Sequence, residues 1–292
     1  GLLALGVYIT YKLLDFADLT VDGSMATGGA VAVMLIRAGM NPWLALIFAF
    51  LAGMAAGFIT GMLHTALGIP GILASILTQI SLYSINLNIL GSSNQAVSVD
   101  KYSLVVSLRY ISDSTASKIR MFTTCILFCV VLVAILYWYF GTEQGFTIRA
   151  TGCNPNMSRA QGINTNFAKV LALVISNGLV GLAGGLYAQY QGNSDVNMGR
   201  GAIVIGLAAV IIGEVLGEAI FGKRLNFIGR LAFVAIGAII YYVVIAFVLW
   251  LGLPSEDMKL FSAIVVAIFL AIPYLRGKSK TSFKRAAKNG GN

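Results

Sequence analysis

Charged side chains are scarce in this sequence. They make up 11% of its 292 residues, whereas hydrophobic residues make up 58%. Soluble domains carry about 25% charged residues, so this composition excludes an ordinary soluble fold. Apolar runs of about 20 residues, each long enough to cross a bilayer, recur along the whole length. These runs lack the alternating polarity of a transmembrane barrel, so the sequence predicts an all-α, polytopic helical membrane protein.

Residues that support catalysis or metal binding are equally scarce. A single histidine, His64, excludes histidine-based triads and most metal sites, and no Cys/His cluster has zinc spacing. The three cysteines predict packed or loop thiols rather than a disulfide scaffold. Gly277-Lys278-Ser279 resembles the end of a phosphate-binding loop, but Ile272 replaces its leading glycine. We predict no catalytic residue, no metal ligand and no cofactor in this chain.

The net charge of +9 has a membrane explanation. Basic residues crowd the C-terminal tail, where they favour a cytoplasmic location and contact with anionic lipid. They are not interleaved with aromatic residues, so we expect no nucleic-acid binding. The sequence thus divides into a membrane domain, 1–275, and a basic tail, 276–292. The tail contains Arg276, Lys278, Lys280, Lys284, Arg285 and Lys288.

Hydropathy and turn signals predict roughly nine transmembrane segments. The first is short, which indicates either a trimmed start or a break near Asp15, and a polar loop occupies 91–118. The seventh is rich in glycine, and the pattern leaves open whether it spans fully or is re-entrant. The predicted segments are 1–14, 23–38, 42–63, 70–90, 121–140, 168–190, 199–218, 229–250 and 257–274.

A polar stretch, 141–167, interrupts the apolar pattern and contains a short predicted helix. Asn154 is a suitable N-cap, Pro155 suits the first helical position, and Gly162 suits a left-handed end. About two turns of helix are unstable alone in water, so this helix is expected to pack against its own domain or another protein. The pattern leaves two alternatives: a docking helix, or a capped surface turn between two spans.

Basic residues also predict the orientation. Two segments on the same side of the membrane must be separated by an even number of crossings. Four predicted crossings separate 141–167 from the tail, so both can be cytoplasmic. The odd total of nine then places the N-terminus outside. More Lys and Arg residues then lie inside than outside, in agreement with the positive-inside rule. We therefore expect a multi-pass plasma-membrane protein with a cytoplasmic C-terminus.

Polar side chains inside the predicted spans need partners away from lipid. Six of them are predicted to line a cavity: Gln79, Tyr83, Asn86, Asn88, Asn177 and Gln189. Hydrogen bonds between helices explain each of them nearly as well. Glycines spaced for close helix packing form two further sets, Gly53, Gly57 and Gly61, and Gly178, Gly181 and Gly185.

Acidic residues allow a proton relay, but ion-paired or hydrated groups at the cytoplasmic boundary are the favoured interpretation. The acids in question are Asp15, Asp18, Asp22, Glu214 and Glu218. A weak internal similarity relates 18–24 to 195–201, because each segment follows an apolar helix and precedes one rich in small residues. On the predicted topology the first lies inside and the second outside, as an inverted repeat demands.

The run 149–164, Arg-Ala-Thr-Gly-Cys-Asn-Pro-Asn-Met-Ser-Arg-Ala-Gln-Gly-Ile-Asn, resembles the cytoplasmic loop of ATP-binding-cassette (ABC) importer permeases of the branched-chain amino acid/ribose type. Segments 18–24 and 201–214 are similar to other marked stretches of that family. The resemblance covers essentially the whole chain. Within the family, it is strongest to permeases of amino-acid importers, often of the tryptophan/tyrosine type.

The resemblance implies an importer with several partners. Two permease subunits form the pore, each docks on an ATPase subunit that binds ATP and magnesium, and an extracellular solute-binding lipoprotein delivers the substrate. The helix that docks on the ATPase, the coupling helix, would comprise Asn154, Pro155, Met157, Arg159, Ala160 and Gly162. Substrate identity, and whether the permease dimer is a homodimer, stay open. The alternatives are an ion-coupled secondary transporter and a non-transporting scaffold.

Overall fold

The computed structural model describes residues 1–97, 102, 104–107, 115–222, 226–250 and a few single positions between 260 and 271. Most of the predicted ninth span, 257–274, and the whole basic tail, 276–292, lie outside the described residues. The described chain is predominantly helical, which confirms the predicted fold class of a polytopic helical membrane protein.

Helices dominate, and two short strands pair antiparallel. The N-terminal half contains α1 (Leu2–Tyr8), η1 (Ile9–Leu13), α2 (Thr20–Arg37), α3 (Pro42–Thr65), α4 (Gly71–Leu90) and β1 (Asn94–Ala96). The C-terminal half contains α6 (Thr115–Phe140), α7 (Glu143–Cys153), α8 (Pro155–Ala160), α9 (Thr165–Gln191), β2 (Asn193–Asp195), α10 (Ala202–Phe221) and α11 (Phe227–Trp250).

Six helices of the described part are long and apolar enough to cross a membrane: α3, α4, α6, α9, α10 and α11. Each coincides with a predicted span to within a few residues. The first two predicted spans correspond to α1–η1 and α2, which do not meet the same criterion. Leu2–Leu13 is too short, and α2 begins with Thr20 and Asp22 and is rich in small residues that add little hydropathy.

Helix α9 forms the centre of the bundle and is the most buried of these six helices, packed between α1, α2 and α3. Glycines bring the backbones of α3 and α9 together. Gly57 faces the carbonyl of Leu173, and Gly53 faces the carbonyl of Asn177 and the backbone of Gly181. In lipid, no hydrophobic effect drives helices together. The close contact of the α3 and α9 backbones therefore holds these helices together by van der Waals packing.

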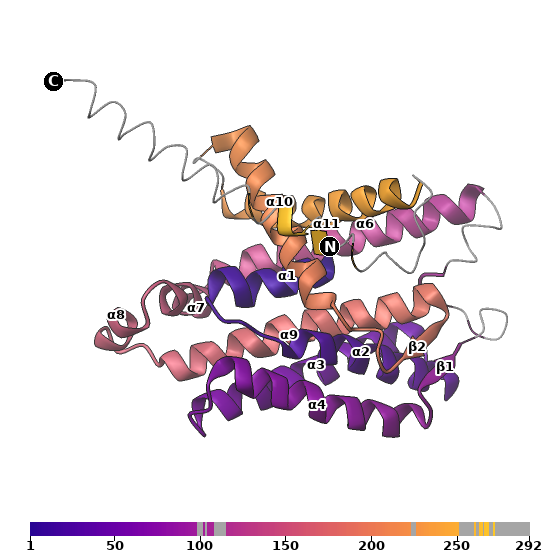
Figure 1. The fold of residues 1–292 in the computed structure, drawn as a ribbon, viewed down its shortest axis with the longest axis horizontal. Coiled ribbons are helices and arrows are strands. Elements are labelled where there is room, and N and C mark those ends of the chain that lie inside the picture. Colours follow the sequence, from indigo (N-terminus) through magenta and orange to yellow (C-terminus); the bar gives the residue numbers. More distant parts are fainter. Residues whose placement is uncertain are drawn as a thin grey trace.

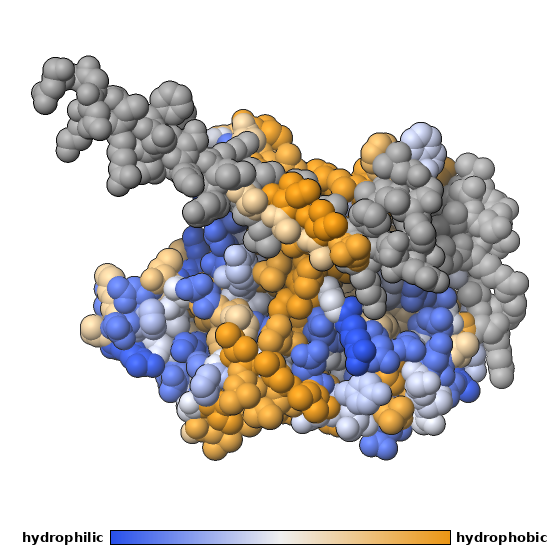
Figure 2. All heavy atoms as spheres, viewed as in Figure 1, coloured by the Kyte–Doolittle hydropathy of each residue, from blue (hydrophilic) through white to orange (hydrophobic). Residues whose placement is uncertain are grey.

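The two ends of the bundle differ. In Figure 1, α7 and α8 lie at one end of the long axis, whereas β1 and β2 pair at the other. Figure 2 shows a band of hydrophobic residues across the molecule between more hydrophilic regions. Large apolar side chains on α3, α4, α6 and α11 are exposed, including Phe58, Ile72, Ile126 and Phe247. Such an apolar outer surface is what a lipid-facing bundle presents.

Substitution of Gly57 tests the α3–α9 contact. A Cβ atom there collides with the backbone of Leu173, so we predict that Gly57→Val destabilises the protein by about 1–3 kcal/mol, as overpacking does. The thermal midpoint in detergent, followed by size-exclusion recovery, should fall. Ala55→Val is the matched control because Ala55 lies on the exposed side of α3. Equal midpoints for the two variants would contradict the close approach.

Candidate functional site

Helix α8 is a short capped helix at the end of the bundle. Asn154 Oδ1 accepts a hydrogen bond of 3.0 Å from the Met157 amide, and Pro155 occupies the first turn. The chain leaves the helix through Gly162, whose φ of +82° is costly for residues with a side chain. These signals in the sequence therefore set both ends of α8.

The outer face of α8 is open. Pro155, Met157, Arg159 and Ala160 are exposed, with Met157 at 59%, whereas Ser158 is buried against the domain. Helix α8 lies at one end of the bundle in Figure 1, and its exposed methionine beside a cation makes a surface of mixed character for a protein contact.

Two connections tie α8 to the membrane helices. Arg159 Nε donates a 2.8 Å hydrogen bond to Thr165 Oγ1, at the first turn of α9. On the other side, α8 follows α7, in which Gly152 packs directly against the backbone of Leu13 and Leu14. A displacement of α8 therefore acts on α9 and on the end of η1.

Helix α7 was missed by sequence reasoning, which expected one helix in 141–167. Its N-cap Thr142 accepts from the Gly145 amide, and Glu143 lies in the first turn. The stretch is neither apolar nor clearly periodic, so hydropathy gives no signal. Thr142 followed by Glu143 was the available indication of a helix start.

A buried polar network joins four segments of the bundle. Asp18 Oδ2 accepts a 2.7 Å hydrogen bond from Asn177 Nδ2, at the middle of α9, and Asn177 Oδ1 accepts one of 2.7 Å from Ser24 of α2. Asp18 Oδ1 also accepts from the Thr20 amide at 3.0 Å. The Thr20 hydroxyl continues the network through Thr60 of α3 to Thr78 of α4.

This network corrects the prediction that Asp18 lies at the cytoplasmic boundary as an ion-paired or hydrated group. Asp18 is 2% exposed, and its hydrogen-bond partners are neutral. The prediction was wrong because the chain turns back inside the bundle after η1, so α2 begins at the level of Asn177. Hydropathy along one segment cannot reveal such a turn.

Glu214 is different. It pairs with Lys12 of η1 at 2.9 Å, which confirms the ion-paired interpretation for this acid. Asp15 and Glu218 are exposed. No group of three or more His, Cys, Asp or Glu side chains within the described residues is arranged to hold a metal ion.

Asp22 fixes the start of α10. Its carboxylate accepts hydrogen bonds from the amides of Gly201 at 3.0 Å and Ile203 at 2.9 Å. A carboxylate at a helix N-terminus satisfies free amides and the helix dipole. Asp22 thus joins the two segments that show internal similarity, 18–24 and 195–201. The two segments contact each other inside the bundle.

Beside this contact lies a polar cavity of about 330 Å³. It contains three of the six predicted cavity residues, Gln79, Tyr83 and Asn86, all from α4. Asp22, Gly23 and Ala26 contribute from α2, Val196, Asn197 and Arg200 from the turn before α10, and Ile80 completes the lining.

The other three predicted cavity residues lie elsewhere. Asn88 is exposed and donates to the Ser84 carbonyl of its own helix at 3.0 Å. Asn177 belongs to the buried network. Gln189 is 1% exposed and accepts from the Val105 amide at 3.0 Å. In the sequence all six residues give the same signal, because a polar residue in a span does not reveal whether its side chain points into a cavity, into the protein interior or outward.

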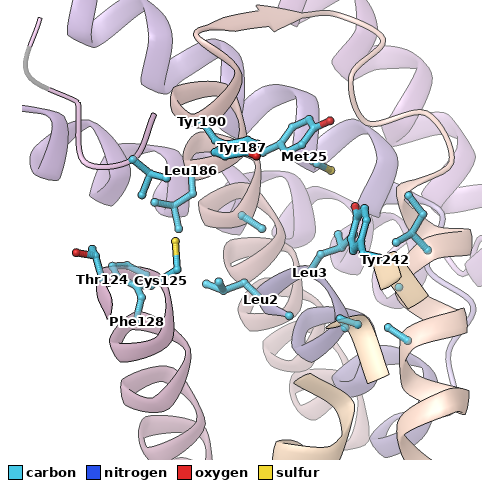
Figure 3. A pocket seen from close by; sticks show the side chains of 18 residues that line it. Leu2, Leu3, Met25, Thr124, Cys125, Phe128, Leu186, Tyr187, Tyr190 and Tyr242 are labelled. Atoms are coloured by element: carbon cyan, nitrogen blue, oxygen red, sulfur yellow. The ribbon is translucent and has the colours of Figure 1, made fainter. Parts of the chain in front are cut away.

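A second cavity, of about 410 Å³, is apolar (Figure 3). Side chains of α1, α6, α9, α10 and α11 line it, and Tyr187, Tyr190 and Tyr242 are its main polar groups. The Tyr187 hydroxyl already accepts a 2.7 Å hydrogen bond from Gln191. The polar cavity is therefore the better candidate for a hydrophilic solute.

Comparison with known proteins places these features in context. Residues 1–273 match the family model for the permease component of branched-chain amino acid transport systems. A tyrosine transport system permease protein of Clostridioides difficile is 38% identical over 289 residues, covering 99% of this chain and 92% of the relative. An uncharacterized protein of Rickettsia prowazekii is 34% identical over 272 residues, 92% of each chain.

A fructose import permease protein of Bifidobacterium longum is 27% identical over 252 residues, covering 86% of this chain and 68% of the relative. No solved structure matches the chain.

Substitution of Asp18 tests the buried network. An amide has one acceptor oxygen where the carboxylate has two, so Asp18→Asn leaves either the Thr20 amide or Asn177 without a partner. We predict a destabilisation of about 1–3 kcal/mol, seen as a lower thermal midpoint in detergent. The matched control is Asp15→Asn, at an exposed position. A midpoint equal to that of the control would show that Asp18 has no such role.

Proposed function

The chain belongs to the family of branched-chain amino acid transport permeases, and on that premise we propose that it imports an amino acid as the transmembrane subunit of an ABC importer. The family is one of transport permeases rather than enzymes. One named relative, a tyrosine transport permease, is 38% identical over 99% of the chain, whereas the fructose permease is 27% identical over 86% of it. This difference favours an aromatic or other hydrophobic amino acid.

The observation that carries the proposal is the exposed helix α8, capped at both ends and bonded to α9. We assign it as the coupling helix, with Asn154, Pro155 and Gly162 fixing its shape and with Met157, Arg159 and Ala160 facing the ATPase. ATP and magnesium belong to that ATPase subunit. A movement of α8 reaches α9 through the hydrogen bond between Arg159 and Thr165. It then reaches the buried network through Asn177.

The proposed assembly follows from this placement. The α8 end is cytoplasmic, and the β1–β2 end faces the solute-binding lipoprotein outside. About nine crossings then put the N-terminus outside and the tail, 276–292, on the cytoplasmic side against lipid. A second permease subunit, as a homodimer, completes the pore with the membrane domain, 1–275.

An inverted repeat is part of the proposal. Asp18 Oδ1 accepts from the amide two residues on, Thr20, at 3.0 Å, and Asp195 Oδ1 does the same with Asn197 at 2.6 Å. Each turn precedes a helix rich in small residues, α2 or α10, whose N-terminus lies inside the bundle. Repeats related in this way commonly meet at a pathway near the bilayer midplane. We assign the polar cavity with Gln79, Tyr83 and Asn86 to that pathway.

Charge reversal on α8 tests the coupling role. We predict that Met157→Glu with Arg159→Glu uncouples the importer, because the apolar contact and the cation are both lost from the docking surface. In proteoliposomes with the ATPase and binding protein, ATP-driven uptake should fall by about tenfold or more, the effect of roughly 1.4 kcal/mol of lost contact, while the permease stays folded.

Gln144→Glu, an exposed change on α7, is the control and should leave uptake unchanged. Uptake in the double variant that equals the control would exclude docking through α8. Uptake that responds to ionophores but not to vanadate would instead indicate a secondary transporter.

A further inference from the structure

The polar cavity is lined by a positively charged side chain, Arg200, next to the central turns of α4. Arg200 lies in the turn directly before α10 and lines the cavity together with Gln79 and Tyr83, which occupy the central turns of that span. Its side chain is exposed and forms no ion pair with any residue in the described part of the chain. In Figure 2 a strongly hydrophilic patch lies near the start of α10, close to hydrophobic spheres.

A guanidinium keeps its charge in any protein environment. Charged groups at membrane depth therefore face a water-filled path or an anion rather than lipid. In the sequence, Arg200 lies at the start of the predicted segment 199–218, directly after a polar stretch. Its place on the cavity wall therefore suits water or an anionic ligand as a neighbour.

The acid on the cavity wall does not neutralise this cation. Both carboxylate oxygens of Asp22 accept hydrogen bonds from the start of α10, one from Gly201 and one from Ile203. Asp22 therefore holds in place the backbone that carries Arg200. It leaves the guanidinium available for a ligand.

Asn86 provides an independent sign of a ligand. Its side chain is 1% exposed and lines the same cavity, yet neither its amide nitrogen nor its amide oxygen has a hydrogen-bond partner in the described structure. Buried polar groups are normally satisfied, and each exception needs a partner such as a ligand. Both the amide N–H donors and the acceptor oxygen of Asn86 are thus free to bind a group of mixed polarity.

We propose that this cavity binds the amino and carboxylate groups of an amino acid in transit, with Arg200 as the cation for the carboxylate. Asn86 supplies its donor and its acceptor to the same two groups. Ile80, Val196 and the ring of Tyr83 leave an apolar wall for the side chain. The inference rests on the proposed function, because it assumes that the solute is an amino acid.

Arginine labelling tests the site directly. Proteoliposomes containing the permease and its ATPase are treated with p-hydroxyphenylglyoxal, and the modification of each arginine is followed by mass spectrometry. Free L-tyrosine or L-leucine should slow labelling of Arg200 several-fold, whereas the corresponding amino-acid amides, which lack the carboxylate, should not. Arg37, exposed at the far end of α2, is the internal control and should label equally throughout.

Uptake provides the second readout. Arg200→Gln should lower ATP-driven uptake of L-tyrosine or L-leucine about ten- to a hundredfold, the range for losing a hydrogen bond to a charged group. Arg200→Lys should retain more activity, and Arg37→Gln should match the wild type. Equal protection by acids and amides, absence of protection, or failure of Arg200 to label would each overturn the assignment.

These results separate the two proposals. ATP-driven uptake by the wild type without protection of Arg200 would overturn the site and leave the importer function intact. Protection of Arg200 by free amino acids without any ATP-driven uptake would support the site and overturn the importer function.

Discussion

The hydrogen bond between Asp18 and Asn177 is the contact on which the rest of this bundle depends. It joins the turn before α2 to the middle of α9, and through Ser24, Thr20 and Thr60 it extends to α2, α3 and beyond. A carboxylate buried among neutral groups needs well-placed donors, and each oxygen of Asp18 has one. Apolar contacts between helices tolerate sliding, since lipid competes with them on nearly equal terms. The polar network does not, so it sets the depth at which α2 begins.

Small residues make that network possible. Gly28 of α2 lies against the backbone of Gly181, and Gly184 lies against Met25, so α2 and α9 approach almost backbone to backbone. At such separations a short serine or asparagine side chain spans the gap between helices. Larger residues would push the helices apart and leave Asp18 without its donor. The glycine stripes and the buried polar groups are thus parts of one arrangement, although they are separate patterns in the sequence.

The sequence specifies more of the local structure than of the tertiary placement. The ends of α8 follow from Asn154, Pro155 and Gly162, because capping and left-handed turns are local chemistry. The six long apolar helices follow from hydropathy for the same reason. The depth of Asp18 depends on a turn of the chain inside the bundle. The same turn allows Asp22 to bond Gly201, a residue 179 positions away in the sequence. For the same reason Asn86 and Asn88 carried equal signals, although one lies in a cavity and the other is exposed.

The position of α9 explains how one end of the molecule can influence its middle. Its first turn is bonded to Arg159 of α8, and its centre carries Asn177, which holds Asp18. Four residues after Asp18, on the same segment, Asp22 holds the start of α10 and with it the turn that carries Arg200. A small axial or rotational shift of α9 therefore changes the geometry at Asp18, at α2 and at the polar cavity in sequence. The links between separate segments on this path are hydrogen bonds of defined direction, so such a path favours discrete alternative arrangements over gradual deformation. Under the proposed function, an ATPase bound to α8 would act along this route on a solute in the cavity.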